Sequence, residues 1–258
     1  MRRVRGAAEM PFLEHLEELR RRLIWILLAL AVGAVGGVVA VTELNVLGWL
    51  QRPIEPYLVE GRLAFTSPTE PIGITFKLGF LLGLIVASPV IAAQLWKFLS
   101  PALYASERRV IVPSLVAAML LFLGGVALGY WVALPLGLRF LLTFQTEALL
   151  PWITAGEYLK FATRVVIAFG VIFELPIVIL ILSALGVVTP AMLRRYRRHA
   201  IILLAVVAAI LTPADIVSML VMLVPLTLLY EGSLWVAVLV TRGRERRLAD
   251  DDAPATSE

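Results

Sequence analysis

The chain has no cysteine and only two histidines among its 258 residues. The lack of cysteine excludes disulfide bonds, thiolate metal sites and thiol nucleophiles. The histidines, His15 and His199, are far apart in the sequence and lie in charged segments, so we interpret both as solvated side chains. Two distant histidines make no metal cluster. The sequence therefore predicts neither a metal site nor a cofactor.

Charge is also scarce. Only 16% of the residues are Asp, Glu, Lys or Arg, whereas 60% are hydrophobic. A soluble domain carries about a quarter charged residues because its surface must be hydrated. The chain is therefore expected to be solvated mostly by lipid. Its net charge of +4 is better explained by membrane topology than by a nucleic-acid partner.

The sequence contains several long apolar runs. A membrane-crossing helix needs about 20 apolar residues. Runs occur at about 23–41, 72–95, 110–134, 158–185, 200–211 and 216–240. The fifth run is short, and the sixth is interrupted by Pro225 and Glu231, so both helices are expected to thin the bilayer locally. The pattern predicts an all-α membrane protein with a single six-helix domain over 1–241.

Arginine and lysine gather on one side of this topology. They are dense in the amino-terminal flank, in the loops after the second and fourth runs, and in the tail. The positive-inside rule then places both termini in the cytoplasm, which requires an even number of crossings. The first run is too long for the core of a cleaved signal peptide. The tail, 242–258, has no apolar pattern and is predicted to be disordered.

Helix boundaries and close contacts have their own signatures. Thr154 and Ser67 each stand three residues before a glutamate, the spacing of a capping box. Cap residues also precede proline at Thr189 and Thr212. Pairs of glycines one turn apart let helix backbones approach closely, and we interpret them as internal packing or chance. These pairs are Gly33/Gly37, Gly79/Gly83 and Gly125/Gly129.

Several residues are unusual at membrane depth. Prolines inside the runs remove backbone hydrogen bonds and bend helices, which favours a curved or hollowed bundle. These prolines are Pro89, Pro113, Pro176 and Pro225. Glu174 lies in the fourth run, two residues before Pro176. A carboxylate at this depth is costly and normally faces a wet cavity or a partner. A functional role for Glu174 is favoured over a structural one.

Acidic residues are few among the basic residues of the predicted cytoplasmic face. Glu17 and Glu18 are each four residues before an arginine, which allows ordinary surface ion pairs. Glu107 precedes Arg108 and Arg109. Each acid is also a candidate docking point for a cation, and the residues alone leave both interpretations open.

Four motifs together resemble the TatC family. The amino-terminal motif is FLEHLEELR, 12–20, and the first cytoplasmic loop runs from Ser88-Pro89 through WKFLSPALY, 96–104, to Glu107-Arg108-Arg109. FELP, 173–176, matches the fourth span, and LTPAD, 211–215, matches the last outer turn. The motifs occur in order over about residues 10–240. Their agreement with the predicted topology makes the resemblance specific.

The resemblance implies a fold and an activity. TatC proteins form a concave, glove-like bundle of six helices in the bacterial cytoplasmic membrane. They are receptors of the twin-arginine translocase, which exports folded proteins using the proton-motive force. The implied partners are twin-arginine signal peptides, the single-span proteins TatA and TatB, and further copies of the receptor.

The resemblance also assigns roles to residues. It implies that Glu18 and Glu107 recognise the signal peptide, supported by Arg20 and Phe98. Glu174 would face the concave cavity, and Pro53 matches a functionally important proline of the first outer loop. The partner-docking surface would include Thr212, Met219 and Glu231. Many TatC sequences have glutamine where this chain has Met219, so the polar contact expected there is in question.

Two other functional classes compete with an export receptor. A proton-coupled secondary transporter of a small solute would explain Glu174 and the bent helices, but no inverted repeat is visible between the halves. An intramembrane enzyme would need a nucleophile with its base, paired aspartates or a metal site at membrane depth. The apolar runs contain no such arrangement. We therefore expect an export receptor that is not an enzyme.

Overall fold

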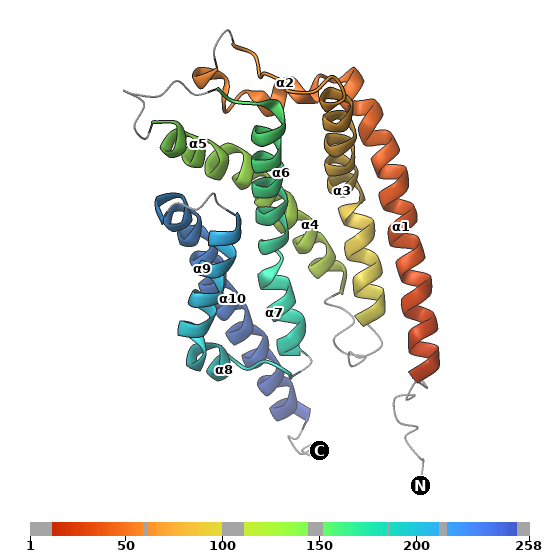
Figure 1. The fold of residues 1–258 in the computed structure, drawn as a ribbon. Helices are drawn as coiled ribbons and strands as arrows, with labels where there is room; N and C mark the ends of the chain where they lie inside the picture. Colours follow the sequence, from red (N-terminus) through yellow and green to blue (C-terminus); the bar gives the residue numbers. More distant parts are fainter. Residues whose placement is uncertain are drawn as a thin grey trace, which may run out of the picture.

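The computed structural model describes residues 12–58, 61–99, 111–143, 152–184, 186–211 and 216–251, and these are almost entirely helical. Their elements are α1 (Phe12–Glu43), α2 (Val46–Gln51), the 3₁₀ turn η1 (Glu55–Tyr57), α3 (Glu70–Leu99), α4 (Ile111–Leu128), the π-helical turn η5 (Gly129–Ala133), α5 (Leu134–Thr143), α6 (Ala155–Ile172), α7 (Leu175–Ala184), α8 (Pro190–Arg195), α9 (Arg197–Leu211) and α10 (Ile216–Asp251). Figure 1 shows their arrangement.

Five segments of the described chain are long and apolar enough to cross a membrane. They are Leu16–Glu43, Glu70–Phe98, Pro113–Thr143, Ala155–Ser183 and Met222–Leu239. They coincide with five of the six predicted runs. The remaining run forms α9, whose 15 residues extend roughly 22 Å at 1.5 Å per residue. This helix is short, as the sequence predicts. The prediction of a short sixth helix is wrong, because α10 continues through Pro225 and Glu231 from Ile216 to Asp251 and contains a full candidate span.

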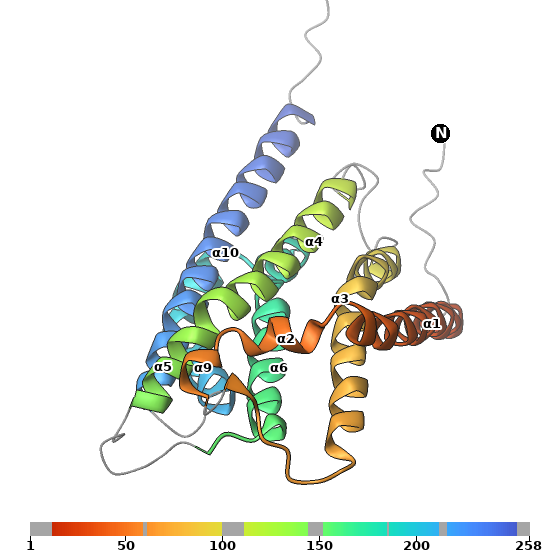
Figure 2. The same cartoon turned by 90° about the horizontal axis from the view of Figure 1, so that it is seen from above.

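The long helices define two ends of the molecule. We call the end where α1 begins and α3 and α10 end the basal end, and the end that carries α2 the apical end (Figure 1). Seen from above, α6 lies between the α1–α3 pair and the group formed by α5, α9 and α10 (Figure 2). Its side chains Ala162, Val165 and Phe169 are fully buried. The core is therefore built around α6.

The α1–α3 pair is held by glycines. A Cβ on Gly37 would lie 2.1 Å from the carbonyl oxygen of Gly79, and one on Gly33 would lie 2.7 Å from that of Gly83. Because only glycine permits such close backbone contact, these two sequence patterns are explained by internal packing. Gly125 likewise lies against the backbone of α6, 2.5 Å from the carbonyl oxygen of Phe169 if a Cβ is added. The interpretation as packing motifs is confirmed.

The predicted helix starts are partly confirmed. Thr154 accepts a hydrogen bond from the Glu157 amide at 3.4 Å, and Thr189 accepts one from the Met192 amide at 3.2 Å. The prediction at Ser67 is wrong, because α3 begins only at Glu70. The Glu70 carboxylate bonds the Thr66 amide instead, at 2.7 Å. Thr212 lies outside the described residues.

Two predicted helices have different shapes from those expected. The third run continues to Thr143 through the π-helical turn, rather than ending at 134. The fourth is divided between α6 and α7. Pro176 lacks the amide that would bond the Ile172 carbonyl, so the helix is interrupted just before it. At this interruption the Glu174 carbonyl accepts bonds from the Ile177 and Val178 amides, both at 3.0 Å.

Residues 242–251, which the sequence pattern assigns to a disordered tail, continue α10 as far as Asp251 in the structure. This segment contains four Arg and one each of Leu, Ala and Glu, all good helix formers. Extending an existing helix avoids the unfavourable step of nucleation. Charge and low hydropathy are therefore not sufficient to predict disorder in a segment that continues a helix. Residues 252–258 lie outside the described chain.

Candidate functional site

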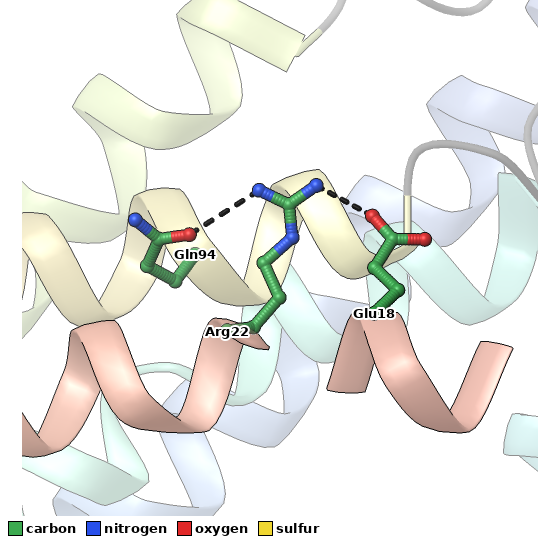
Figure 3. Close-up of polar contacts among 3 residues, drawn as sticks. All are labelled: Glu18, Arg22 and Gln94. Atoms are coloured by element: carbon green, nitrogen blue, oxygen red, sulfur yellow. Dashed lines mark hydrogen bonds and ion pairs between the residues drawn. The ribbon is translucent and has the colours of Figure 1, made fainter. Parts of the chain in front are cut away.

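Three side chains meet at the basal end of the α1–α3 pair (Figure 3). Arg22 forms an ion pair with Glu18 one turn earlier, with 2.5 Å between Nη2 and Oε1. Its other terminal nitrogen, Nη1, donates to Oε1 of Gln94 on α3 at 3.3 Å. The arginine and glutamate side chains are about one-fifth exposed. Arg22 therefore fixes the Glu18 carboxylate and ties it to the neighbouring helix.

The position of Phe98 follows from the same helix pair. The glycine contacts and the Arg22–Gln94 bond share one antiparallel register. Continuing that register by one turn toward the basal end places Glu18 level with Phe98, which is half-buried. Two predicted site residues that are 80 positions apart are thus brought to the same height. Arg20 is exposed on α1, and Glu107 lies outside the described residues.

The link between Arg22 and Gln94 was missed by sequence reasoning. The Glu18–Arg22 spacing predicts an ion pair along one helix, and that pair is confirmed. The contact with α3 depends on the register of two helices. A possible signal was Gln94 itself, a single amide near the end of an apolar run. Two residues later, Trp96 is buried against Ala118 and Ile177, which anchors this end of α3.

Glu174 lies at the interruption between α6 and α7 and is half-buried. The described side chains form no hydrogen bond or ion pair with its carboxylate. Its position agrees with a break in the fourth predicted span. Among the described residues there is no group of three or more His, Asp or Glu side chains that could hold a metal ion.

Two of the three residues assigned to partner docking, Met219 and Glu231, are engaged within the fold, and Thr212 lies outside the described residues. Glu231 of α10 forms an ion pair with Arg197 at the start of α9, with 2.5 Å between Oε1 and Nη2. Its neighbour Tyr230 donates to the Leu193 carbonyl of α8 at 2.7 Å. Met219 is partly buried against the main core. The ion pair thus connects α10 to α9 at the place where Glu231 interrupts the sixth apolar run, and α10 itself is continuous there.

Pro53 lies at the apical end, in the turn after α2. Two tyrosines hold this turn: Tyr130 donates to the Trp49 carbonyl at 2.5 Å, and Tyr158 donates to the Leu50 carbonyl. Pro53 is half-buried beside an open hollow whose other lining residues are Trp49, Arg52, Tyr130, Trp131 and Pro135. Sequence reasoning missed this cluster because its members come from segments about 80 residues apart.

Comparison with known proteins agrees with this architecture. The family model described as "Sec-independent protein translocase protein (TatC)" matches residues 14–225. The chain is 40% identical to the TatC protein of Aquifex aeolicus over 238 residues, covering 92% of this chain and 98% of that protein. It is 39% identical to TatC of Koribacter versatilis over 249 residues, covering 94% and 91%.

A solved structure is similar along nearly its whole length. It is a crystal structure of the twin-arginine translocase receptor TatC, with a TM-score of 0.78 and 38% sequence identity. The match covers 88% of this chain and 99% of that one. A second crystal structure of the same receptor, in the detergent DDM, gives a TM-score of 0.79. This chain belongs to the TatC family of Sec-independent protein translocase proteins.

Proposed function

We propose that this protein is the receptor subunit of a twin-arginine translocase and binds twin-arginine signal peptides at its basal end. In this proposal it crosses the bacterial cytoplasmic membrane six times, with α9 as the short fifth span and both termini in the cytoplasm. Basic side chains at the basal end support that orientation under the positive-inside rule. The described ones include Arg20, Arg21, Lys97, Arg194, Arg195 and Arg198.

The observation that carries the proposal is the Glu18–Arg22–Gln94 arrangement. Arg22 occupies one carboxylate oxygen of Glu18, while the other points away from Arg22 (Figure 3). An ionised carboxylate offers about four acceptor positions, so this pairing leaves room for a second cation. A carboxylate held in place at the membrane boundary loses little freedom on binding.

Arginine fits this site better than lysine. Its planar guanidinium presents several donors in a fixed fork, whereas the lysine ammonium is a compact point charge. Bonds between guanidinium and carboxylate are short, strong and often bidentate. Glu18 and Glu107 would each receive one arginine of the pair. Phe98, level with Glu18, would contact the adjoining apolar residues, and Arg20 would balance the local charge.

The remaining assignments extend the proposal to translocation. The receptor would act with TatA and TatB, assemble with further copies of itself, and use the proton-motive force. Glu174 would face the concave side of the glove-like bundle. Thr212, Met219 and Glu231 would belong to the partner-docking surface, and Pro53 to a functional outer loop. For Glu231, docking would require a partner that accepts or replaces the Arg197 ion pair.

The proton-coupled transporter is not favoured, because the family and its solved members are translocase proteins.

An export assay separates the two functions. Glu18→Ala and Glu107→Ala should block export of twin-arginine precursors while the protein still inserts into the membrane. Glu17→Ala, an exposed carboxylate beside Glu18, is the matched control and should export normally. Normal export by both site variants would contradict the proposal, and loss of small-solute uptake in Glu174→Ala would favour the transporter.

A further inference from the structure

The hollow beside Pro53 is built from two rigid elements at the apical end. Its volume is about 240 Å³, and its lining residues come from the α2 turn and from the π-helical turn with the start of α5. The Tyr130 hydroxyl bridges the two elements by its bond to the Trp49 carbonyl. Ile54, which follows Pro53, is almost completely buried in the core. The walls of the hollow are therefore fixed by the fold.

The positive charge of the hollow comes from Arg52. The guanidinium carbon lies 4.5 Å from the centre of the Trp49 ring, a cation–π arrangement. No carboxylate of the described residues lies within ion-pairing distance of Arg52. A guanidinium in contact with an aromatic ring still has N–H donors for an anion. The hollow thus combines an exposed cation with aromatic walls and no acidic counterpart in the described chain.

The hollow adjoins surface that must face lipid. Trp131 is 67% exposed and lies within the candidate span Pro113–Thr143. Val132 and Leu136 beside it are also exposed. Exposed tryptophans are typical of the boundary between hydrocarbon and headgroups. An occupant of the hollow would therefore reach it from the bilayer.

We propose that this hollow binds the headgroup of an anionic phospholipid in the leaflet at the apical end. The lipid phosphate would accept hydrogen bonds from Arg52, and the glycerol and upper acyl chain would pack between Trp49 and Trp131. Arginine and phosphate form charge-assisted, often bidentate hydrogen bonds. The site requires membrane insertion but does not depend on signal-peptide recognition. It gives the hollow beside the α2 turn a ligand that the translocase assignment does not supply.

Native mass spectrometry of the full-length protein tests this site. The protein, released from detergent, is titrated with phosphatidylglycerol or with phosphatidylcholine of the same acyl chains. Wild type should bind one phosphatidylglycerol with a preference that Arg52→Gln weakens by about tenfold, the loss expected for one charge-assisted bond. Arg62→Gln, which removes another exposed apical arginine, is the control and should bind like wild type. Equal binding of both lipids, or equal loss in both variants, would overturn the proposal.

Two further measurements keep the test decisive if Arg52→Gln folds poorly. Phosphatidylglycerol brominated near the headgroup should quench wild-type tryptophan fluorescence more than brominated phosphatidylcholine. That excess should disappear in the Trp49→Phe/Trp131→Phe double variant, and its persistence would overturn the site. Soluble glycerol phosphate should not displace the lipid. Displacement at equal concentration would identify a site for free phosphate and contradict a lipid site.

Discussion

The carboxylate of Glu70, the first residue of α3, accepts a 2.7 Å hydrogen bond from the amide of Gly156 in the first turn of α6. Its other oxygen accepts bonds from the amide and hydroxyl of Thr66. Beside it, the Ala155 amide donates to the Ala64 carbonyl at 2.7 Å. One side chain thus joins the two apical connections and supplies an acceptor at the positive end of α6.

Replacing Glu70 should loosen this apical junction. Glu70→Ala removes the acceptor for three donors, so the melting temperature of the purified protein should fall by several degrees. Glu157→Ala is the matched control. Glu157 is an exposed acid in the first turn of α6, beside Gly156, and it bonds Thr154 through its amide rather than its carboxylate. Both variants would be followed by circular dichroism. An equal shift in the two would show that only helix-terminal charge matters.

The α1–α3 pair should not tolerate a methyl group at Gly37. The added Cβ would meet the backbone carbonyl of Gly79, which cannot rotate away as a side chain can. Overpacking of this kind destabilises by roughly 1–3 kcal/mol. Gly36→Ala is the control, because a Cβ there has nothing within 4 Å and alanine favours the helix. Unfolding in mixed micelles measures both, and equal stability of the two variants would contradict the close approach.

The Arg197–Glu231 ion pair should stabilise the contact between α9 and α10. Because Arg197 is more than half exposed, we expect Glu231→Gln to lower the free energy of unfolding by only about 1 kcal/mol. Adding Arg197→Gln to that variant should then cost little, which is the signature of a coupled pair. Arg198→Gln, an exposed neighbour, serves as the control. Strict additivity of the two substitutions would show that the ion pair contributes nothing.

Local patterns predicted the spans and several helix starts, because hydropathy, glycine spacing and caps act over one or two turns. Thr154, Thr189 and the Gly33/Gly37 pair are confirmed for this reason. The start of α3 was misplaced because Glu70 is held by Thr66 and by Gly156, and the second partner is 86 positions away. A pattern limited to neighbouring residues cannot contain that contact.

In the candidate site, too, contacts within one helix were predicted and contacts between helices were not. The Glu18–Arg22 pair follows from helical spacing alone. The bond to Gln94 and the position of Phe98 depend on how α1 and α3 align, which the glycines permit but do not set. The hollow near Pro53 depends on the π-helical turn, which orients Tyr130 toward Trp49. Hydropathy does not distinguish a π turn from a continuous α-helix, so this site was not predicted.

The most direct test of the receptor assignment is site-specific crosslinking at the basal end. A photoreactive residue replaces Ser106, beside Glu107, in membrane vesicles that contain the partner proteins. Precursors with Arg-Arg or Lys-Lys signals are then presented to wild type, to Glu18→Gln and to the control Glu17→Gln. The proposal predicts a crosslink with Arg-Arg only, lost in Glu18→Gln and kept in Glu17→Gln. Equal labelling by both signals, or labelling that persists in Glu18→Gln, would contradict recognition of the arginine pair by this carboxylate.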